Sequence, residues 1–166
     1  MFDKIESPRE LFTYKLGAAL TMEQKVLGML GQLEQEAHRS ELKQQFAHHA
    51  SETQQQITNL EQIFQSIGVE VEDKPCPAIE GLEKEGQAMI KMADDNLVDA
   101  VILGAAAETE HHEIAVYSSL ITQAEALGEQ DAVPLLQENF EIEEHTLQEV
   151  EKAAQQVVPQ ILTASQ

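Results

Sequence analysis

The chain of 166 residues contains 30 acidic but only 10 basic residues, which gives a formal net charge of −20 at pH 7. This charge excludes nucleic-acid binding through phosphate contacts and attraction to anionic membrane surfaces, and it makes cations the expected partners. Hydrophobic residues make up 42% of the chain and aromatic residues only 4%, while Ala, Leu, Glu and Gln dominate. The composition is typical of a helical bundle, and the length suits a single domain spanning residues 1–166.

The N-terminal sequence MFDKIESPRE lacks the basic segment and apolar run of a secretory signal. No stretch of about 18 apolar residues occurs that could cross a membrane. The single cysteine, Cys76, cannot form a disulfide within the chain. We therefore expect a cytoplasmic protein that does not associate with membranes.

The first two long helices are bounded by capping signals. Ser7, a following proline and Glu10 form the capping box that opens the first helix, which is expected to run to about Ala37. A tight turn at 38–40 precedes the second helix, which is expected to end at Gly68. Because so short a turn joins them, the two helices should be antiparallel.

The rest of the chain predicts a crossover followed by a second helical pair. The expected segments are, in order, a loop at 69–79, a shorter helix at 80–93, a third long helix from about 95 to 127, a fourth from about 131 to 159, and a short C-terminal helix. Two antiparallel hairpins joined by one long crossover favour an all-α, ferritin-like four-helix bundle.

Each long helix carries glutamate on or beside its apolar face. At 100° per residue, the inward-facing glutamates are Glu23 on the first helix, Glu110 and Glu113 on the third, and Glu143 on the fourth. On the second helix Glu52 lies at the edge of the apolar stripe, whereas His49 and Gln56 lie within it. Glutamate is almost never fully buried without a partner, so these positions require one.

The glutamates also match in height along the bundle. Glu23 precedes the expected helix end at residue 37 by the same interval as Glu113 precedes the helix end at residue 127. Likewise, Glu52 follows the helix start at residue 40 by the same interval as Glu143 follows the start at residue 131. At about 1.5 Å per residue, both intervals place the carboxylates roughly 20 Å from their turns. Each hairpin therefore brings two carboxylates to one level.

Several buried carboxylates at one level cannot all stay ionised without protons or cations to neutralise them. Two divalent metal ions would balance four carboxylates. Oxygen ligands with at most one imidazole suit iron(II), or alternatively manganese(II), and such dinuclear sites recur in helical bundles. The pattern therefore predicts a dinuclear metal centre.

Each residue also has a purely structural interpretation. A single inward glutamate is more often a snorkelling or hydrogen-bonded side chain than a ligand, although four at matched heights favour the metal. His49 is either a satisfied core histidine or a residue that binds or orients the metal, and Gln56 is comparable. Tyr117, one turn after Glu113, is either ordinary core or a redox residue lining the site.

Five segments of the chain resemble the YciE/YciF family of bacterial ferritin-like stress proteins. These segments are LTMEQKVLGML, HHASETQQQITNLEQIF, KPCPAIEGLEKEG, AAAETEHHEIAVYSSL and LLQENFEIEEH. The resemblance covers roughly residues 7–155. It implies a ferritin-like bundle, usually a homodimer, with a dinuclear metal centre and no settled activity. It supports as metal-site residues Glu23, His49, Glu52, Gln56, Glu110, Glu113 and Glu143.

The chain departs from the wider di-iron group at two points. The Glu-x-x-His pairs expected on the second and fourth helices are absent, because Gln55 follows Glu52 and Thr146 follows Glu143 at that spacing. Leu147 also occupies a position where relatives often have an acid. Fewer ligands imply a more weakly held metal and slower oxygen chemistry.

Three functions fit these observations. The first is a redox enzyme in which two irons react with oxygen or peroxide. The second is a non-catalytic metal-binding or stress-protective module, and the third is a metal-free acidic scaffold for a protein partner. An open coordination position with an access channel would favour the enzyme.

Overall fold

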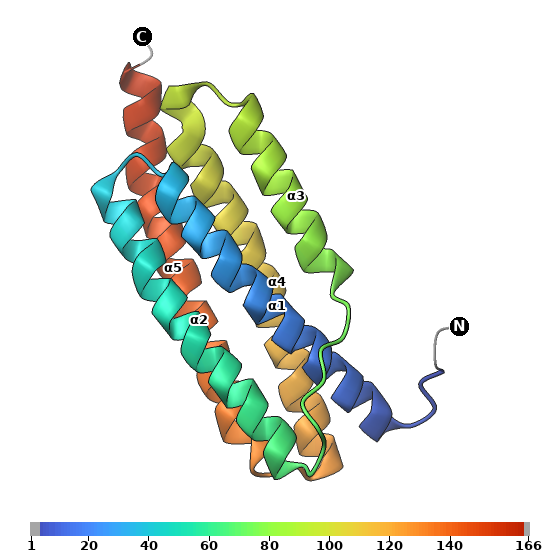
Figure 1. Ribbon diagram of the computed structural model, residues 1–166. Helices are drawn as coiled ribbons and strands as arrows, with labels where there is room; N and C mark the ends of the chain where they lie inside the picture. The colour runs from blue at the N-terminus through green and yellow to red at the C-terminus, as the bar shows by residue number, and fades with distance from the viewer. Residues whose placement is uncertain (1–3, 165–166) are drawn as a thin grey trace.

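The computed structural model describes residues 4–164, and the only regular secondary structure within this range is helical (Figure 1). The elements are α1 (Pro8–Glu36), α2 (Ser40–Ser66), α3 (Pro77–Met92), a short 3-10 helix η1 (Asp95–Leu97), α4 (Val98–Leu127) and α5 (Ala132–Ala164). Two short segments lie outside the described residues, namely 1–3 and 165–166. The first belongs to the N-terminal sequence compared above with a secretory signal, and the second ends the expected domain. The expected all-α class is confirmed.

The four long helices form two antiparallel hairpins that lie side by side (Figure 1). α1 packs mainly on α2 and α4 mainly on α5, with further contacts between α1 and α4 and between α2 and α5. The connection from α2 to α4 runs the length of the bundle and contains α3, which lies against α1 and α4. This is the long crossover of the ferritin-like arrangement that the sequence predicts.

The predicted helix boundaries depend on caps that the structure contains. The backbone N–H of Glu10 donates to Ser7 Oγ over 3.2 Å, so Ser7 is the N-cap of α1. Gly68 (φ 70°) and Gly128 (φ 75°) follow the C-termini of α2 and α4 in the left-handed region, which glycine adopts without steric cost.

Three boundaries differ from the prediction. The third long helix begins at Val98 rather than near residue 95, because residues 95–97 form the 3-10 helix η1. α3 begins at Pro77 rather than near residue 80, because a proline in the first helical turn needs no hydrogen-bond acceptor. The segment expected to form a separate C-terminal helix is helical but continues α5 through Pro159 to Ala164. Pro159 lacks the N–H that would donate to the carbonyl of Gln155. Gln155 is exposed, so water can donate to this carbonyl instead.

The crossover lies directly against α1 at Gly17. A Cβ atom added there would lie 2.4 Å from the backbone oxygen of Glu72 and 2.7 Å from Cγ of Lys74. The Lys74 N–H also donates to the Gly17 carbonyl over 3.1 Å. Gly17 is therefore required for the crossover to lie directly on α1 and so to reach the far end of the bundle.

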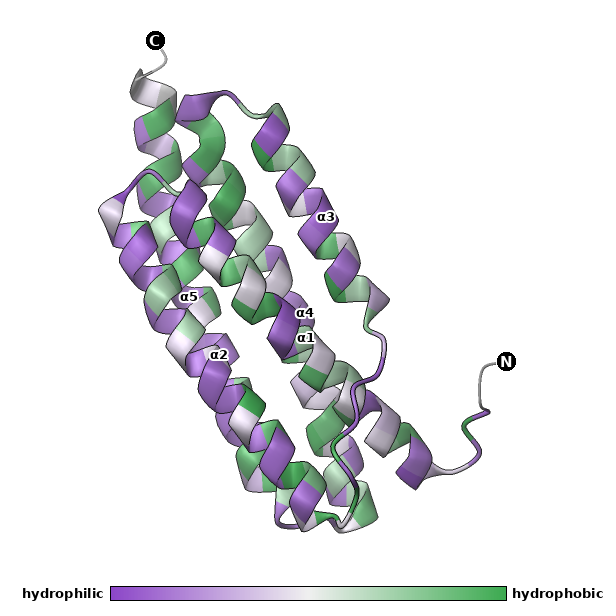
Figure 2. Cartoon of the chain, in the orientation of Figure 1, coloured by the Kyte–Doolittle hydropathy of each residue, from purple (hydrophilic) through white to green (hydrophobic). Residues whose placement is uncertain are grey.

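The hydrophobic core runs along the axis between the two hairpins. Its fully buried side chains include Leu16, Leu20, Leu60, Ile63, Phe64, Leu120 and Leu136. Figure 2 shows hydrophilic and hydrophobic residues side by side on every helix, as expected for amphipathic helices that each bury one face. Within residues 4–164, no helix combines the length and apolar character needed to cross a bilayer.

Candidate metal centre

A layer of buried polar side chains interrupts this core. We call it the polar layer, and each of its members is at most 4% exposed. Its members are Glu23 of α1; His49, Gln56 and Asn59 of α2; Glu110, Glu113 and Tyr117 of α4; and Asn139, Glu143 and Thr146 of α5. The layer takes side chains from all four long helices. It includes the four glutamates that the sequence predicts to face inward, and all four are buried.

Four members of the layer form a cluster that could hold a metal ion. His49, Glu110, Glu113 and Glu143 each offer one ligand atom, and these atoms all lie within 4.8 Å of one another. His49 Nε2 lies 3.4 Å from Glu110 Oε1 and 3.7 Å from Glu143 Oε2. Three carboxylates and one imidazole form a donor set that suits divalent iron or manganese.

The unpaired atoms of the cluster test whether a cation fits. Both carboxylate oxygens of Glu113 are buried and have no hydrogen-bond partner, and the same is true of one oxygen each of Glu23, Glu110 and Glu143. His49 Nε2 makes no well-aligned hydrogen bond, and it faces Glu110 and Glu143 at ion-pair distance. Buried polar atoms are normally paired, and a bound cation would satisfy these oxygens together. The residues present therefore fit a metal.

Glu23 lies beside this cluster and is bound to Tyr117. The Tyr117 hydroxyl donates to Glu23 Oε1, and Asn139 Nδ2 donates to the same hydroxyl over 3.0 Å. Glu23 thus has one oxygen held by Tyr117 and one without a partner. The sequence allows Tyr117 to be either a core residue or a site residue, and in the structure it is buried in the polar layer and contacts a candidate ligand.

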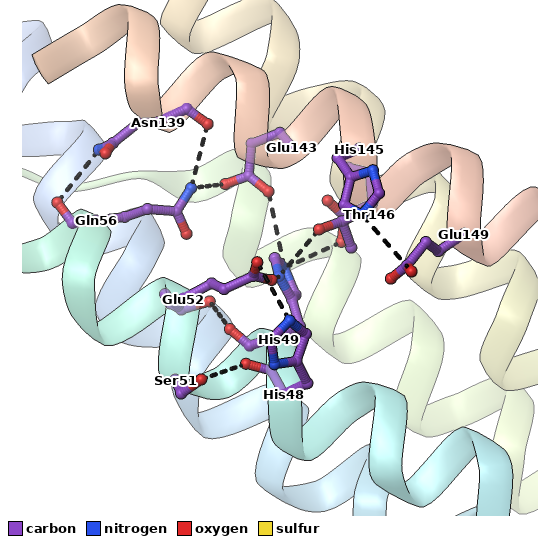
Figure 3. A network of polar contacts seen from close by, with 12 residues as sticks. His48, His49, Ser51, Glu52, Gln56, Asn139, Glu143, His145, Thr146 and Glu149 are labelled. Atoms are coloured by element: carbon purple, nitrogen blue, oxygen red, sulfur yellow. Dashed lines mark hydrogen bonds and ion pairs between the residues drawn. The ribbon is translucent and has the colours of Figure 1, made fainter.

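Glu52 occupies a different environment from the other glutamates. Its side chain is 24% exposed, and the structure does not bring it into the four-residue cluster. Glu52 Oε2 lies 3.4 Å from His49 Nδ1, and Glu52 Oε1 lies 3.5 Å from His48 Nε2 (Figure 3). Because Nε2 of His49 faces the cluster, Glu52 holds the opposite ring nitrogen and orients the imidazole.

Gln56 also contacts the site through hydrogen bonds. Its Nε2 donates to Glu143 Oε1 and to the Asn139 carbonyl, the latter over 3.4 Å (Figure 3). In return Asn139 Nδ2 donates to the Gln56 carbonyl over 3.2 Å, and Asn59 Nδ2 donates to Asn139 Oδ1 over 2.8 Å. Gln56 therefore fixes one oxygen of Glu143 and joins α2 to α5.

The sequence analysis missed three members of the layer, namely Asn59, Asn139 and Thr146. Helical spacing could have found them, because Asn59 follows Gln56 by three residues, and Asn139 and Thr146 lie four before and three after Glu143. Thr146 Oγ1 lies 3.2 Å from His49 Nδ1. The threonine at the expected Glu-x-x-His position thus contacts the only imidazole of the cluster.

Burial and neighbouring charges together set the protonation of the layer in the metal-free protein. Burial raises the pKa of Glu23 to about 7, and burial together with neighbouring carboxylates raises the pKa values of Glu113 and Glu143 well above the ordinary value. For His49 burial alone would lower the pKa, but Glu110 and Glu52 raise it to about 10. Without a metal, the site therefore retains protons at neutral pH.

Comparison with known proteins supports the same fold. Residues 7–163 match the family described as "Domain of unknown function (DUF892)". Protein YciF of Escherichia coli K12 is 34% identical over 139 residues, which cover 82% of this chain and 84% of YciF.

Two solved structures are also similar. The crystal structure of the E. coli stress protein YciF has a TM-score of 0.89 at 30% identity, covering 93% of this chain and 99% of that chain. The structure of YcfI from Rhodopseudomonas palustris has a TM-score of 0.88 at 33% identity, covering 91% of this chain and 98% of that chain. The similarity thus extends over nearly the whole bundle.

Proposed function

Because the chain belongs to the DUF892 family of YciF-like proteins, we propose that it is a ferritin-like carboxylate protein that binds two divalent metal ions. A set of carboxylates with one imidazole suits both iron and manganese, and we propose iron as the metal with manganese as the alternative. The relative YciF is described as a stress protein, which supports a role of this chain in the response to stress.

The unpaired carboxylate oxygens are the single observation that carries this proposal. Glu23, Glu110, Glu113 and Glu143 are at most 3% exposed, and each has at least one buried oxygen without a hydrogen-bond partner. Two divalent ions carry four positive charges, which match four carboxylates. Protons can neutralise these groups in the metal-free protein, but each protonated carboxyl donates only one hydrogen bond, whereas a cation would contact several of the unpaired oxygens at once.

The proposal assigns a role to each residue. His49, Glu110, Glu113 and Glu143 hold the metal, and Glu23 adds the fourth carboxylate from α1. Gln56 positions Glu143 through its amide, whereas Glu52 and Thr146 orient His49 from the side of Nδ1. Tyr117 positions Glu23 and is in turn held by Asn139.

A bound iron pair would supply redox chemistry with oxygen or peroxide. The chain would exclude bulk water from that chemistry, because every member of the polar layer is buried. Tyr117 lies against Glu23, so it is the residue placed to donate a proton or an electron near the metals.

A non-catalytic metal-binding module is the second candidate. It is favoured by the single imidazole in the cluster, since Thr146 stands where a second histidine would complete a Glu-x-x-His pair. A site with fewer nitrogen ligands should bind iron(II) more weakly and react more slowly.

Elemental analysis of protein purified without chelator or affinity metal tests the proposal. We expect about two metal ions per chain in the wild type and in Glu144→Ala, an exposed neighbour that serves as the matched control. Glu143→Ala should lose the metal while remaining helical by circular dichroism. Full metal content in Glu143→Ala would refute the assignment.

Stopped-flow absorbance separates the two candidate functions. Protein loaded anaerobically with iron(II) is mixed with oxygen or with peroxide. Oxidation faster than that of iron(II) in buffer supports the redox protein, and oxidation at the buffer rate supports the binding module.

A further inference from the structure

A cavity of about 670 Å³ lies between the crossover helix α3 and the helices α1 and α4. Its walls are mainly apolar and include Val26, Leu30, Leu33, Leu82, Ile90 and Ala106. The volume falls within the range of sites that bind small molecules. Figure 1 shows α3 alongside α1 and α4, where it covers this part of the bundle.

The inner end of the cavity reaches the candidate metal centre. Glu110 is one of its lining residues, and this side chain is only 3% exposed. One Glu110 oxygen has no hydrogen-bond partner, and the same residue belongs to the four-residue cluster. A molecule that fills the cavity would therefore end beside the proposed metals.

The cavity is elongated along the helices. On α4 its lining residues extend from Val98 to Glu110, which spans about 18 Å at the rise of an α-helix. Its outer end lies near the C-terminal ends of α1 and α3, where Glu36 and Lys91 line it. The shape suits a chain-like molecule rather than a compact one.

The charges around the cavity disfavour an anionic ligand. Of the charged lining residues, Glu36, Glu83, Asp95 and Glu110 are acidic, whereas Lys91 is basic. The remaining titratable lining residue, His38, lies 3.5 Å from Asp95. A carboxylate group would also meet a chain with a net charge of −20. At the inner end a cationic group would compete with the metals for Glu110. Away from this end, Glu83 lies 3.4 Å from Lys25 and Asp95 faces His38, so these acids have basic neighbours within the chain. An uncharged molecule therefore fits both ends.

We propose that this cavity binds an uncharged, elongated apolar molecule with its inner end beside Glu110, and that such molecules are the substrate class of the metal centre. The binding rests on the cavity itself. The substrate role rests on the proposed function. The two parts can therefore fail separately.

Fluorescence of the neutral probe N-phenyl-1-naphthylamine tests the binding. We expect the metal-free wild type to bind the probe and 1-decanol to displace it, whereas decanoate at the same concentration should not. No probe binding, no displacement by decanol, or equal displacement by decanoate would overturn the proposed ligand class.

Two leucine substitutions on α3 locate the bound probe. A Cβ at Gly86 would lie 3.5 Å from Cβ of Ala105 on the cavity wall, so Gly86→Leu should obstruct the cavity and weaken probe binding about tenfold. Gly81 lies on the same helix, and a Cβ added there would meet nothing within 4 Å beyond its adjacent residues and its own helix backbone, so Gly81→Leu should bind like the wild type. Equal affinity in both variants would place the probe elsewhere.

Metal analysis and NMR separate this inference from the proposed function. Both variants should keep the wild-type metal content, because neither residue belongs to the polar layer. In protein loaded with manganese(II), one end of bound decanol should show stronger paramagnetic broadening than the other, and zinc-loaded protein should show none. Uniform or absent broadening would refute the substrate role. A protein that binds decanol but no metal would refute the proposed function and leave the binding site standing.

Discussion

Replacing Glu23 by glutamine should stabilise the metal-free protein at alkaline pH and destabilise the metal-bound protein. Glutamine has nearly the shape of glutamate and keeps an oxygen that can accept the hydrogen bond from Tyr117. The substitution therefore removes the charge from a fully buried position without opening a cavity. Its effect on stability should depend on pH and on metal.

The pKa of Glu23 determines the magnitude. Burial raises this pKa from 4.5 to about 7, so the folded state retains a proton that the unfolded chain releases. The stability that comes from this proton is fully present below pH 4.5 and is lost as the pH rises to about 7. At about 1.4 kcal/mol per pKa unit, ionisation of the unfolded chain lowers the free energy of unfolding by about 3 kcal/mol at pH 8. Glutamine avoids this loss.

Urea unfolding at pH 5 and pH 8 measures the effect in the presence of a chelator. Relative to the wild type, Glu23→Gln should gain about 2 to 3 kcal/mol between the two pH values. The cost of burying an amide is the same at both, and the raised pKa of His49 is present in both proteins. The exposed Glu34→Gln should show no such gain.

Manganese(II) added at pH 8 should reverse the order of stability. In the proposed site the wild type offers the metal four carboxylates and the variant offers three, so the wild type should gain more stability. An unchanged difference between pH 5 and pH 8, or equal stabilisation of both proteins by manganese, would refute the reasoning.

Three further predictions follow from single contacts and from the family. Tyr117→Phe should lower the free energy of unfolding by about 1 to 3 kcal/mol, because Glu23 and Asn139 lose a buried partner, yet elemental analysis should find its metal content unchanged. Gly17→Ala should lower the free energy of unfolding by about 1 to 3 kcal/mol in urea because it displaces the crossover, whereas Gly28→Ala should be neutral or stabilising, because its Cβ would meet nothing within 4 Å beyond its adjacent residues and its own helix backbone. Light scattering at micromolar concentration should give twice the monomer mass, and a monomer would contradict the expected homodimer.

The sequence could predict the level of the site because helix geometry is regular. The rise per residue is constant, so equal distances from the turns bring glutamates of different helices to one height. Glu113 and Glu143, which are matched in this way, indeed lie in one cluster in the structure. The caps at Ser7, Gly68 and Gly128 are local features, and for this reason the main helix ends were predictable as well.

Side-chain direction could not be read from the same pattern. Glu23 and Glu52 match each other in height, yet Glu23 turns to Tyr117 and Glu52 turns to His49 and stays partly exposed. A helical wheel gives the direction in which each Cβ points around the helix axis. The rotamer of the side chain depends on its partners from other helices. The apolar cavity was equally invisible, because it depends on how α3 rests on α1 and α4.

Some polar groups of the polar layer have hydrogen-bond partners and others have none. This distribution favours a role of the carboxylates in binding a cation over a role in pairing the helices. Near Asn59 the polar groups of the layer bond to one another. Asn139 accepts a hydrogen bond from Asn59 and donates to the Gln56 carbonyl and the Tyr117 hydroxyl. Such a network can join helices and specify their pairing without any ligand. Glu113 lies in the same layer and is equally buried, yet neither of its oxygens has a partner. If polar groups were present only to pair the helices, an amide at this position would cost less than a glutamate, because the buried glutamate must either lose the hydration of its charge or take up a proton. The carboxylate is explained when a metal ion supplies the missing partner.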